Sequence, residues 1–381
     1  MKHSKTLRKV AIATKDFHGR RSVSIHSNFV LSLLQSLEFS PAIISTGKLE
    51  APSQTRKKPI GQAVRGLAAP VAYGVSERSA LRDILRVLDS FRLLGVASKT
   101  LQSASLVHWF EHYGAIHRVL QMMYPRTTNC ITLFSYLKRY AAYDALLKLS
   151  LRGFNRIVTT TKEFRRILAS LGIDSRRITV IPLGVDTSYF RPPPDKSVQK
   201  SMLGLGQDAR VITYFAQITP SIENDFRGML EIALGAHSVD NNLKFLFCFK
   251  NLPADVARLE IPGVKFFGRV DVRSILWATD LLALPFTAST PYAVQPLTAV
   301  EALACGVPLI ALRHPALEEL VVDGVNGVLV SEFQELHGRL VGIVNQSSTL
   351  STMSIEARQT ASEKFDIKSV AQSYLNLWLE T

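Results

Sequence analysis

The sequence predicts an α/β protein built from two doubly wound domains, and three observations lead to that prediction. A chain of 381 residues that is 47% hydrophobic can bury two cores of ordinary domain size. Short apolar runs alternate with amphipathic stretches along the chain, which is typical of parallel strands covered by helices on both faces. Near the midpoint, the apolar run 178–183 leads into Gly184, Asp186 and the prolines Pro192 to Pro194, a pattern typical of a stiff joint between domains.

The apolar runs give the expected strands in order. In the first half we expect strands at 10–14, 41–46, 105–110, 130–134, 156–160 and 178–183. In the second half we expect them at 210–216, 243–249, 264–268, 281–286 and 307–312. We therefore place a first domain at 1–188, a second at 189–360, and a C-terminal helix that packs back on the first domain at 361–381. In that helix Val370, Tyr374, Leu377 and Trp378 share one face, which is expected to be buried.

Two segments between the expected strands at 41–46 and 105–110 depart from this alternation of strands and helices. Residues 47–75 are rich in Gly, Pro and basic side chains and lack a clear period, so we predict a mobile loop. Residues 76–95 are predicted to form an amphipathic helix that carries Arg78, Arg82 and Arg86 along one side. A cationic helix of this kind is typical of binding to a membrane surface, and it is equally typical of a solvated face on a folded domain.

The positive charge is concentrated in the first half of the chain. Residues 1–190 hold 29 basic and 11 acidic side chains, a net charge of +18, whereas the remainder carries −4. This asymmetry predicts an anionic partner for the first half only. No recognition-helix motif, zinc module or RNA-binding aromatic pattern is present, so we expect an acidic membrane surface as the partner and no nucleic acid.

The cysteines and the N-terminal residues indicate the cellular compartment in which the protein is expected. Cys130, Cys248 and Cys305 lie far apart in apolar runs, which predicts reduced core residues and neither disulfides nor zinc ligands. The first residues are too poor in apolar side chains for a signal-peptide core, and no run of 18 apolar residues occurs. We therefore expect a cytoplasmic protein, peripherally bound to the cytosolic face of a membrane.

The segment around Glu301 carries the most chemical information. Glu301 lies in a good helix-forming run that ends at Gly306 and is followed at once by a strand. A carboxylate on such a helix, facing a cleft, is suited to accept hydrogen bonds from the paired hydroxyls of a ribose. On pattern alone, Glu301 is equally well explained as a solvated helix carboxylate.

Three motifs together resemble a known family. The stretches "ITVIPLGVDTSYFRP", "VKFFGRVDVRSILWATDLLALPF" and "PLTAVEALACGVPLIALRHPALEELVVDGVNGVLV" are similar, in order and spacing, to the retaining nucleotide-sugar-dependent glycosyltransferases of family 4. The likeness runs from about residue 150 to about residue 335. It implies the GT-B architecture, in which two Rossmann-like doubly wound domains face each other across a cleft. It also implies a nucleotide held by the second domain, an acceptor held by the first, and no cofactor and no metal.

Only some of the family's residues near the transferred sugar are present in this chain. Glu301 matches the second Glu of the family's E-x7-E motif, the one that holds the ribose, but Ala293 stands where the first Glu, which touches the sugar, is expected. The stretch "VQPLTAVE" resembles a variant of the motif in which Gln295 supplies a polar contact in place of that carboxylate. Either the sugar is recognised differently in this chain or catalysis is lost.

The family's contacts to the diphosphate and the base have partial matches. A basic pair normally neutralises the diphosphate, and here Gln217 stands at the first position and Arg227 at the second. A guanidinium can bind phosphate oxygens bidentately, so Arg227 could act alone with help from helix N–H groups, although a surface arginine would look the same. Gly268 and Arg269 match the turn at which the base meets backbone groups.

The first half offers further candidates. Gly19 lies in the loop after the first strand, where the family has a glycine-containing loop, and the strand end "VHWFE" resembles the family's His-x-His-Glu, with His108 and Glu111 retained. Ser135 replaces a family histidine that contacts the donor sugar. The spacing of His108 and His112 also suggests a metal site, but a strand end is poor geometry for it and a third ligand is missing.

These observations lead to one interpretation and two alternatives. We expect a hexosyltransferase-type enzyme that moves a sugar from a nucleoside diphosphate sugar to a glycan or lipid-linked acceptor at a membrane. Glu111, Gln295 and Ser135 are its candidate catalytic residues. A catalytically silent scaffold of the same fold would explain Ala293 and Ser135 as well. A nucleotide-sugar epimerase would need a set of catalytic carboxylates and histidines that we do not find.

Overall fold

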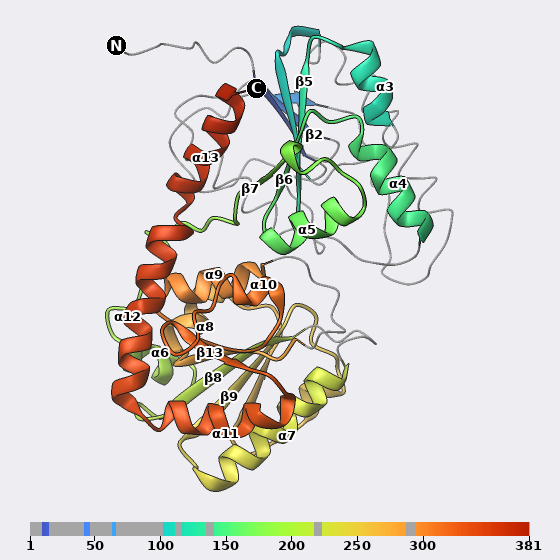
Figure 1. Ribbon diagram of the computed structural model, residues 1–381. Coiled ribbons are helices and arrows are strands. Elements are labelled where there is room, and N and C mark those ends of the chain that lie inside the picture. The colour runs from blue at the N-terminus through green and yellow to red at the C-terminus, as the bar shows by residue number, and fades with distance from the viewer. Residues whose placement is uncertain are drawn as a thin grey trace. The chain divides into compact units, whose positions relative to one another are not determined.

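The protein forms two compact units, each with its own parallel sheet (Figure 1). The computed structural model describes residues 10–14, 42–45, 63–65, 102–110, 116–134, 141–216, 223–286 and 295–380. The first unit comprises Met1–Pro182 together with Ile367–Thr381, and the second comprises Leu183–Asp366. The predicted fold class, two Rossmann-like α/β domains with parallel sheets, is confirmed.

The described part of the first unit contains a parallel sheet of seven strands in the order β3-β2-β1-β4-β5-β6-β7. The central strands β4 and β5 consist almost entirely of buried residues, as expected for strands covered on both faces. The strands are β1 Val10–Thr14, β2 Ala42–Ser45, β3 Ala63–Arg65, β4 Leu106–Phe110, β5 Thr128–Leu133, β6 Arg156–Thr159 and β7 Ile178–Val180. The helices that the structure describes in this unit are α3 Ile116–Met123, α4 Ala141–Leu151, α5 Lys162–Ser170 and α13 Ile367–Glu380.

One strand of this sheet lies where the sequence predicted a loop. Strand β3, Ala63–Arg65, falls inside the segment 47–75 and pairs in parallel with β2. The prediction was wrong at these residues because three residues between glycines and prolines are too short to show a period of their own. The remainder of that segment, and the expected helix at 76–95, lie outside the described residues.

Helix α13 is joined to the first sheet by a buried polar network centred on His108. Trp378 Nε1 donates to His108 Nδ1 at 2.8 Å, and His108 Nε2 lies 2.8 Å from Thr132 Oγ1. Because Nδ1 accepts, the proton of the neutral ring sits on Nε2, which donates to Thr132. Tyr374 OH completes the chain at 3.1 Å from Thr132 Oγ1. Burial lowers the pKa of His108 to about 3, so the ring is neutral at physiological pH.

This network assigns His108 a structural role. Both ring nitrogens are used inside the first unit, so His108 is not available as a metal ligand or as a contact for a substrate. The predicted apolar face of α13 is buried, and the His108 ring also lies edge-on to Tyr374 and Trp378 at centroid distances of 5.4 and 5.7 Å. The C-terminal helix is therefore part of the first unit.

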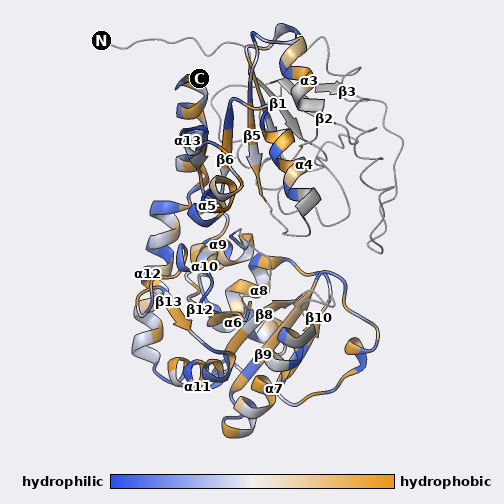
Figure 2. Cartoon of the chain, turned by 45° about the vertical axis from the view of Figure 1, so that its right-hand side comes forward, coloured by the Kyte–Doolittle hydropathy of each residue, from blue (hydrophilic) through white to orange (hydrophobic). Residues whose placement is uncertain are grey.

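The described part of the second unit contains a parallel sheet of six strands in the order β10-β9-β8-β11-β12-β13. The strands are β8 Arg210–Ala216, β9 Leu243–Phe249, β10 Val264–Phe267, β11 Leu281–Leu284, β12 Leu309–Leu312 and β13 Gly327–Val330. The first five agree with the expected runs. Strand β13 was not expected, because the preceding "DGVNG" dominated the sequence pattern there. Figure 2 shows the hydrophobic colouring of β9 and β13 inside this unit.

Helices cover both faces of the second sheet. On one face, α7 and α11 pack against residues such as Phe247 and Ile310. On the other, α9 and α12 pack against residues such as Leu282 and Ala311. The helices of this unit are α6 Lys196–Met202, α7 Glu223–Val239, α8 Val272–Ala278, α9 Leu297–Ala304, α10 Pro315–Glu318, α11 Phe333–Val344 and α12 Ser347–Lys364.

The proline-rich segment after β7 belongs to the second unit and is bound tightly to it. The Arg358 guanidinium, on α12, donates to the carbonyl oxygens of Thr187, Phe190 and Ala304 at 3.0, 2.9 and 2.7 Å. Trp277 Nε1 donates to the Arg191 carbonyl at 2.7 Å. Gly306, with φ of 71°, ends α9 beside the Pro192 ring. The three prolines therefore continue a segment that is already fixed on this unit.

The His108 network leads to a prediction about stability. Replacement Trp378→Phe keeps most of the buried ring but leaves His108 Nδ1 without its donor in a fully buried site. We expect a loss of about 1–3 kcal/mol in the free energy of unfolding, measured by urea denaturation followed by circular dichroism. The control is Asn376→Ala on the exposed face of α13, which should change stability by less than about 0.5 kcal/mol. Equal effects of the two variants would contradict the role of the network.

Candidate functional site

The strand order of the second sheet defines where a ligand would bind. From β8 the chain proceeds outward through β9 to β10, and from β11 it proceeds in the opposite direction through β12 to β13. The boundary between β8 and β11 is therefore a topological switch point, and in open parallel sheets ligands bind outside the carboxyl ends of the strands at such a point. Helices α7 and α9 follow β8 and β11, so both begin at this edge.

Glu301 is a partly buried carboxylate on α9, which follows β11. Its neighbours in sequence, Val300 and Ala302, are completely buried. Burial raises the pKa of the Glu301 carboxyl to about 7, and the nearby Asp271 carboxylate adds a smaller contribution in the same direction. No hydrogen bond joins the Glu301 carboxyl to any described residue. The Glu301 side chain is only partly exposed, and among the described residues it has no hydrogen-bond donor.

Asp271 belongs to the turn that connects β10 to α8. It caps α8: Ser274 donates to one of its carboxylate oxygens through Oγ at 2.6 Å and through its backbone N–H at 3.1 Å. The carboxylate of Asp271 is close enough to affect Glu301 electrostatically, so this turn lies near α9. Two of the predicted site residues, Gly268 and Arg269, lie in this turn, so the structure places them in the same part of the unit as Glu301.

Gly268 leaves open space at its α-carbon. A β-carbon added there would meet only Leu252, at an ordinary contact distance of 3.8 Å. Other glycines of this unit have a positive φ, which favours glycine, but Gly268 does not. No described protein group therefore requires a glycine at this position, and the room beside the backbone is available to a ligand.

Lys250 is a residue of this edge that the sequence analysis missed. It follows β9 directly, is partly buried, and is close enough to Arg269 to feel its charge. Burial, followed by the positive charge of Arg269, lowers the pKa of the Lys250 ammonium. The signal in the sequence was a basic residue directly after the apolar run 245–249.

Arg227 lies in the second turn of α7 and is exposed to solvent. The next residue, Gly228, is required by packing, because a β-carbon there would lie 2.5 Å from the ring of Phe333 on α11. The glycine after Arg227 therefore allows α7 and α11 to pack closely. The start of α7, with Arg227 nearby, is suited to bind an anion.

Gln295 lies just before α9 and is buried. Its Oε1 accepts a hydrogen bond from the Leu183 backbone N–H at 3.3 Å. Its amide nitrogen makes no hydrogen bond to any described residue. The oxygen thus fixes the start of the second unit, and the –NH₂ group is the part of the side chain left for a ligand.

Several predicted site residues cannot be placed. Gly19, Glu111, Ser135, Gln217, Arg78, Arg82 and Arg86 lie outside the described residues, as does Ala293. The "DGVNG" loop is placed and is a structural turn: Asp323 Oδ1 accepts from the Leu329 N–H at 2.9 Å, and Asn326 is completely buried. Within the described ranges, no cluster of three or more metal-ligating side chains occurs.

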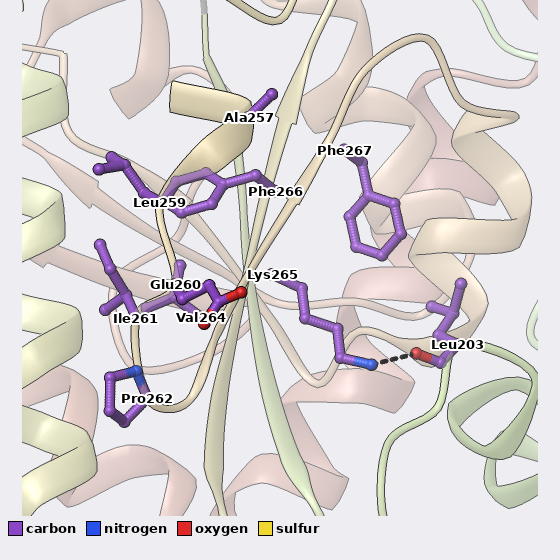
Figure 3. Close-up of a pocket in the computed structure, with 10 residues that line it drawn as sticks. All are labelled: Leu203, Ala257, Leu259, Glu260, Ile261, Pro262, Val264, Lys265, Phe266 and Phe267. Atoms are coloured by element: carbon purple, nitrogen blue, oxygen red, sulfur yellow. Dashed lines mark hydrogen bonds between the residues drawn. The ribbon is translucent and has the colours of Figure 1, made fainter. Parts of the chain in front are cut away.

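A separate hollow of about 680 Å³ lies along the outer side of the edge strand β10 (Figure 3). Eight of its ten lining residues are apolar, among them Leu259, Ile261 and Phe267. The one ammonium in it, that of Lys265, donates to the carbonyl oxygens of Leu203 and Gly204 at 2.7 and 2.9 Å. None of the predicted site residues lines this hollow, which we interpret as the groove beside an uncovered edge strand.

The arrangement at the carboxyl edge fits a nucleotide. Backbone N–H groups and Arg227 at the start of α7 can meet phosphates, and the Glu301 carboxylate can accept from two hydroxyls. The open backbone at Gly268 leaves room for a flat ring. All three features belong to the second unit.

Comparisons with known proteins relate both halves of the chain to glycosyltransferases. Residues 51–189 match the family model described as Glycosyltransferase Family 4, and residues 214–345 match the model described as Glycosyl transferases group 1. D-inositol 3-phosphate glycosyltransferase of Mycobacterium tuberculosis (strain ATCC 25618 / H37Rv) is 32% identical over 188 residues, which cover 46% of this chain and 37% of that protein. The chain thus matches little more than a third of that relative's length.

Solved structures share the fold over almost the whole chain. HepE of Anabaena in complex with UDP has a TM-score of 0.69 at 16% identity, covering 98% of this chain and 100% of HepE. Sucrose-phosphate synthase from Thermosynechococcus elongatus has a TM-score of 0.74 at 16% identity, covering 98% of this chain and 99% of that enzyme. At this identity the likeness establishes the fold.

The raised pKa of Glu301 leads to a prediction about pH. Between about pH 4.5 and 7 the folded protein holds a proton on Glu301 that the unfolded chain releases, so this group's contribution to stability falls as pH rises through that window. Replacement Glu301→Gln removes the effect. At pH 8, urea denaturation should find this variant more stable than the unliganded wild type by up to about 3 kcal/mol, with the difference vanishing below pH 4.5. The control is Glu231→Gln, at an exposed position of α7, which should leave the pH profile unchanged.

Proposed function

This chain belongs to glycosyltransferase family 4, and from that membership we propose that it transfers a sugar from a nucleoside diphosphate sugar to an acceptor. The observation that carries the proposal is Glu301, a partly buried carboxylate that accepts no hydrogen bond from any residue the structure describes, on the helix that follows β11 at the switch point of a doubly wound sheet. A ribose 2′,3′-diol supplies two donors to such a group. The solved complexes of HepE contain UDP and UDP-glucose, which supports this donor class. The substrate supplies the reactive bond, and no cofactor or metal enters the proposal.

The diphosphate is proposed to lie at the start of α7. Transfer of the sugar leaves a nucleoside diphosphate with an additional negative charge, so groups that stabilise that charge lower the barrier. Arg227 and the N–H groups at the helix start can do so, with Gln217 as a neutral hydrogen-bonding partner. The family's retention of configuration is carried over as part of the proposal.

The sugar side of the site is where this chain departs from its family. Ala293 and Ser135 stand where family members have a carboxylate and an imidazole, and neither short side chain can span the same distance. Glu111 and the amide nitrogen of Gln295 are the proposed replacements. The same departures favour a second candidate function, a catalytically silent protein that binds a nucleotide as a scaffold.

The acceptor is proposed to be a glycan or lipid-linked molecule at the cytosolic face of a membrane. The +18 charge of residues 1–190 and the arginines of the 76–95 segment support docking on acidic headgroups. Among the helices that the structure describes, none is both long and apolar enough to cross a bilayer.

Nucleotide binding tests the core of the proposal. Glu301→Ala should weaken nucleoside diphosphate binding by about 1–3 kcal/mol, measured by calorimetry, because ribose hydroxyls lose their acceptor. The control Glu231→Ala should bind as the wild type does. A competition series of nucleoside diphosphates against their sugar conjugates, followed by donor hydrolysis over hours, then separates the two functions. Preference for one conjugate with slow hydrolysis supports the enzyme, whereas indifference to the sugar without hydrolysis, even with membranes supplied, supports the scaffold.

Vesicle binding tests the membrane. Changing Arg78, Arg82 and Arg86 together to Gln should lower affinity for acidic vesicles by about 3 kcal/mol, at about 1 kcal/mol for each basic residue, and leave nucleotide affinity intact. The matched control changes three exposed cations of the second unit to Gln: Arg258, Arg339 and Lys364. Vesicle binding that is insensitive both to the arginine changes and to added salt would exclude these arginines as the docking surface.

A further inference from the structure

Asp225 is a buried carboxyl at the start of α7 that has no partner among the described residues. It is 3% exposed, and its Oδ2 is shielded from solvent without a hydrogen bond. No residue that the structure describes forms an ion pair with it. Among the buried side chains that lack a partner in the described ranges, only Asp225 carries a carboxyl. Burial of this kind disfavours the ionised form of an acid, so the group calls for a proton, a cation or a hydrogen-bond donor.

The fold places this carboxyl at the carboxyl edge of the second sheet. Asp225 is the third residue of α7 and shares its buried face with Met229 and Ile232, at spacings of four and three residues. Helix side chains tilt toward the N-terminus of their helix, so the carboxyl lies beside the first turn. The next residue, Phe226, packs against Phe249 at the end of β9, with ring centroids 5.7 Å apart.

Burial alone changes the ionisation of Asp225. It raises the pKa of the carboxyl to about 6, and no neighbouring charge contributes. Helix α11 and strand β9 pack against α7. The charged or titratable side chains on these elements and on the first two turns of α7 are Glu223, Arg227, Lys244, Lys250 (directly after β9), Glu335, His337 and Arg339, with Glu332 just before α11. Since none of them shifts the pKa, the proton on Asp225 depends on what binds at the helix start.

An ionised Asp225 would oppose the ligand assigned to this position. This step rests on the proposed function, which places the diphosphate of the donor at the start of α7. Two anions at one helix start repel each other, and the second anion raises the pKa of the carboxyl further. The neutral acid has the opposite effect, because its O–H donates a hydrogen bond to a phosphate oxygen. Binding of the diphosphate therefore favours the protonated form of Asp225.

We propose that Asp225 takes up a proton from solvent when the diphosphate binds, and that its O–H then donates a hydrogen bond to a phosphate oxygen. The O–H bond of the carboxyl forms, and no bond of the ligand breaks. The free protein releases this proton above about pH 6, whereas the complex keeps it. Affinity for the donor therefore falls as pH rises above that value, so acid conditions favour donor binding and alkaline conditions favour release of the diphosphate product.

The test measures the affinity of the full chain for UDP-glucose or GDP-glucose, whichever binds more tightly, by calorimetry with EDTA present. The comparison is Asp225→Asn, whose amide N–H is a donor that does not titrate. The ratio of wild-type to variant affinity should fall about tenfold or more between pH 6 and pH 8. Because both proteins retain Glu301 and use the same ligand, other titrations cancel in this ratio. At pH 7, titrations in buffers of different ionisation enthalpy should show the wild type taking up about one proton more than the variant.

Two further variants act as controls. Glu231→Gln makes the same change from carboxyl to amide at an exposed position of α7 and should follow the wild type at every pH. Asp225→Leu offers no donor and should bind about tenfold more weakly than Asp225→Asn at pH 6. Binding by Asp225→Asn at pH 6 that is close to the wild-type affinity also reports that this variant is folded.

The other outcomes overturn the inference in distinguishable ways. Identical pH profiles for the wild type and Asp225→Asn, in a protein that binds the nucleotide sugar, would remove Asp225 from the site and leave the proposed function standing. A ratio that rises with pH would make Asp225 an ionised acceptor for a hydroxyl of the ligand. Wild-type affinity that requires Mg²⁺, with no such requirement in Asp225→Asn, would assign a cation to the carboxylate in place of the proton. A wild type that binds neither nucleotide sugar at any pH would overturn both proposals.

Discussion

The constraint on which the candidate site depends is the partial removal of one carboxylate, that of Glu301, from water. Helix α9 is apolar apart from Thr298 and Glu301, and most of its residues are fully buried between the sheet and α12. Packing this helix against β12 therefore shields Glu301, whose carboxyl pKa rises to about 7. A partly buried acceptor with no donor among the described residues is unfavourable in the free protein, and a ligand that supplies hydroxyl groups offsets that cost.

The two units use buried polar groups in opposite ways. In the first unit, His108, Thr132, Tyr374 and Trp378 form a closed chain of hydrogen bonds that fixes the C-terminal helix. In the second unit, the Glu301 carboxyl has no donor among the described residues, and Lys250 and Arg269 have no acceptor there. Polar groups that all have hydrogen-bond partners fix the structure. Polar groups that lack partners among the described residues and lie at one edge of a sheet indicate a ligand.

Sequence reasoning could predict what depends on local pattern. Continuous apolar runs gave ten of the thirteen strands closely and located β7 at the start of its run, because a strand buried on both faces needs such residues. Strands β3 and β13 were not predicted, because short strands next to glycines contain too few residues to show a hydrophobic pattern. The family resemblance suggested a functional His108, but the indole N–H that occupies its ring comes from Trp378, 270 residues away. Lys250 was missed for the same reason, since its proximity to Arg269 becomes visible only when β9 and β10 are in place.

Charge along the carboxyl edge of the second sheet is arranged in like pairs. Lys250 and Arg269 lie close enough for their charges to interact, and so do Asp271 and Glu301, so the like charges within each pair repel each other in the free protein. The two pairs are separated by a single turn, in which Arg269 and Asp271 are two residues apart. A protein optimised for stability alone would exchange these charges into opposite pairs. The hydroxyls of a bound nucleoside would donate to Glu301 and so weaken the repulsion between the two carboxylates. Groups that are unfavourable in the free protein and that a ligand can satisfy distinguish a binding site from a structural ion-pair network.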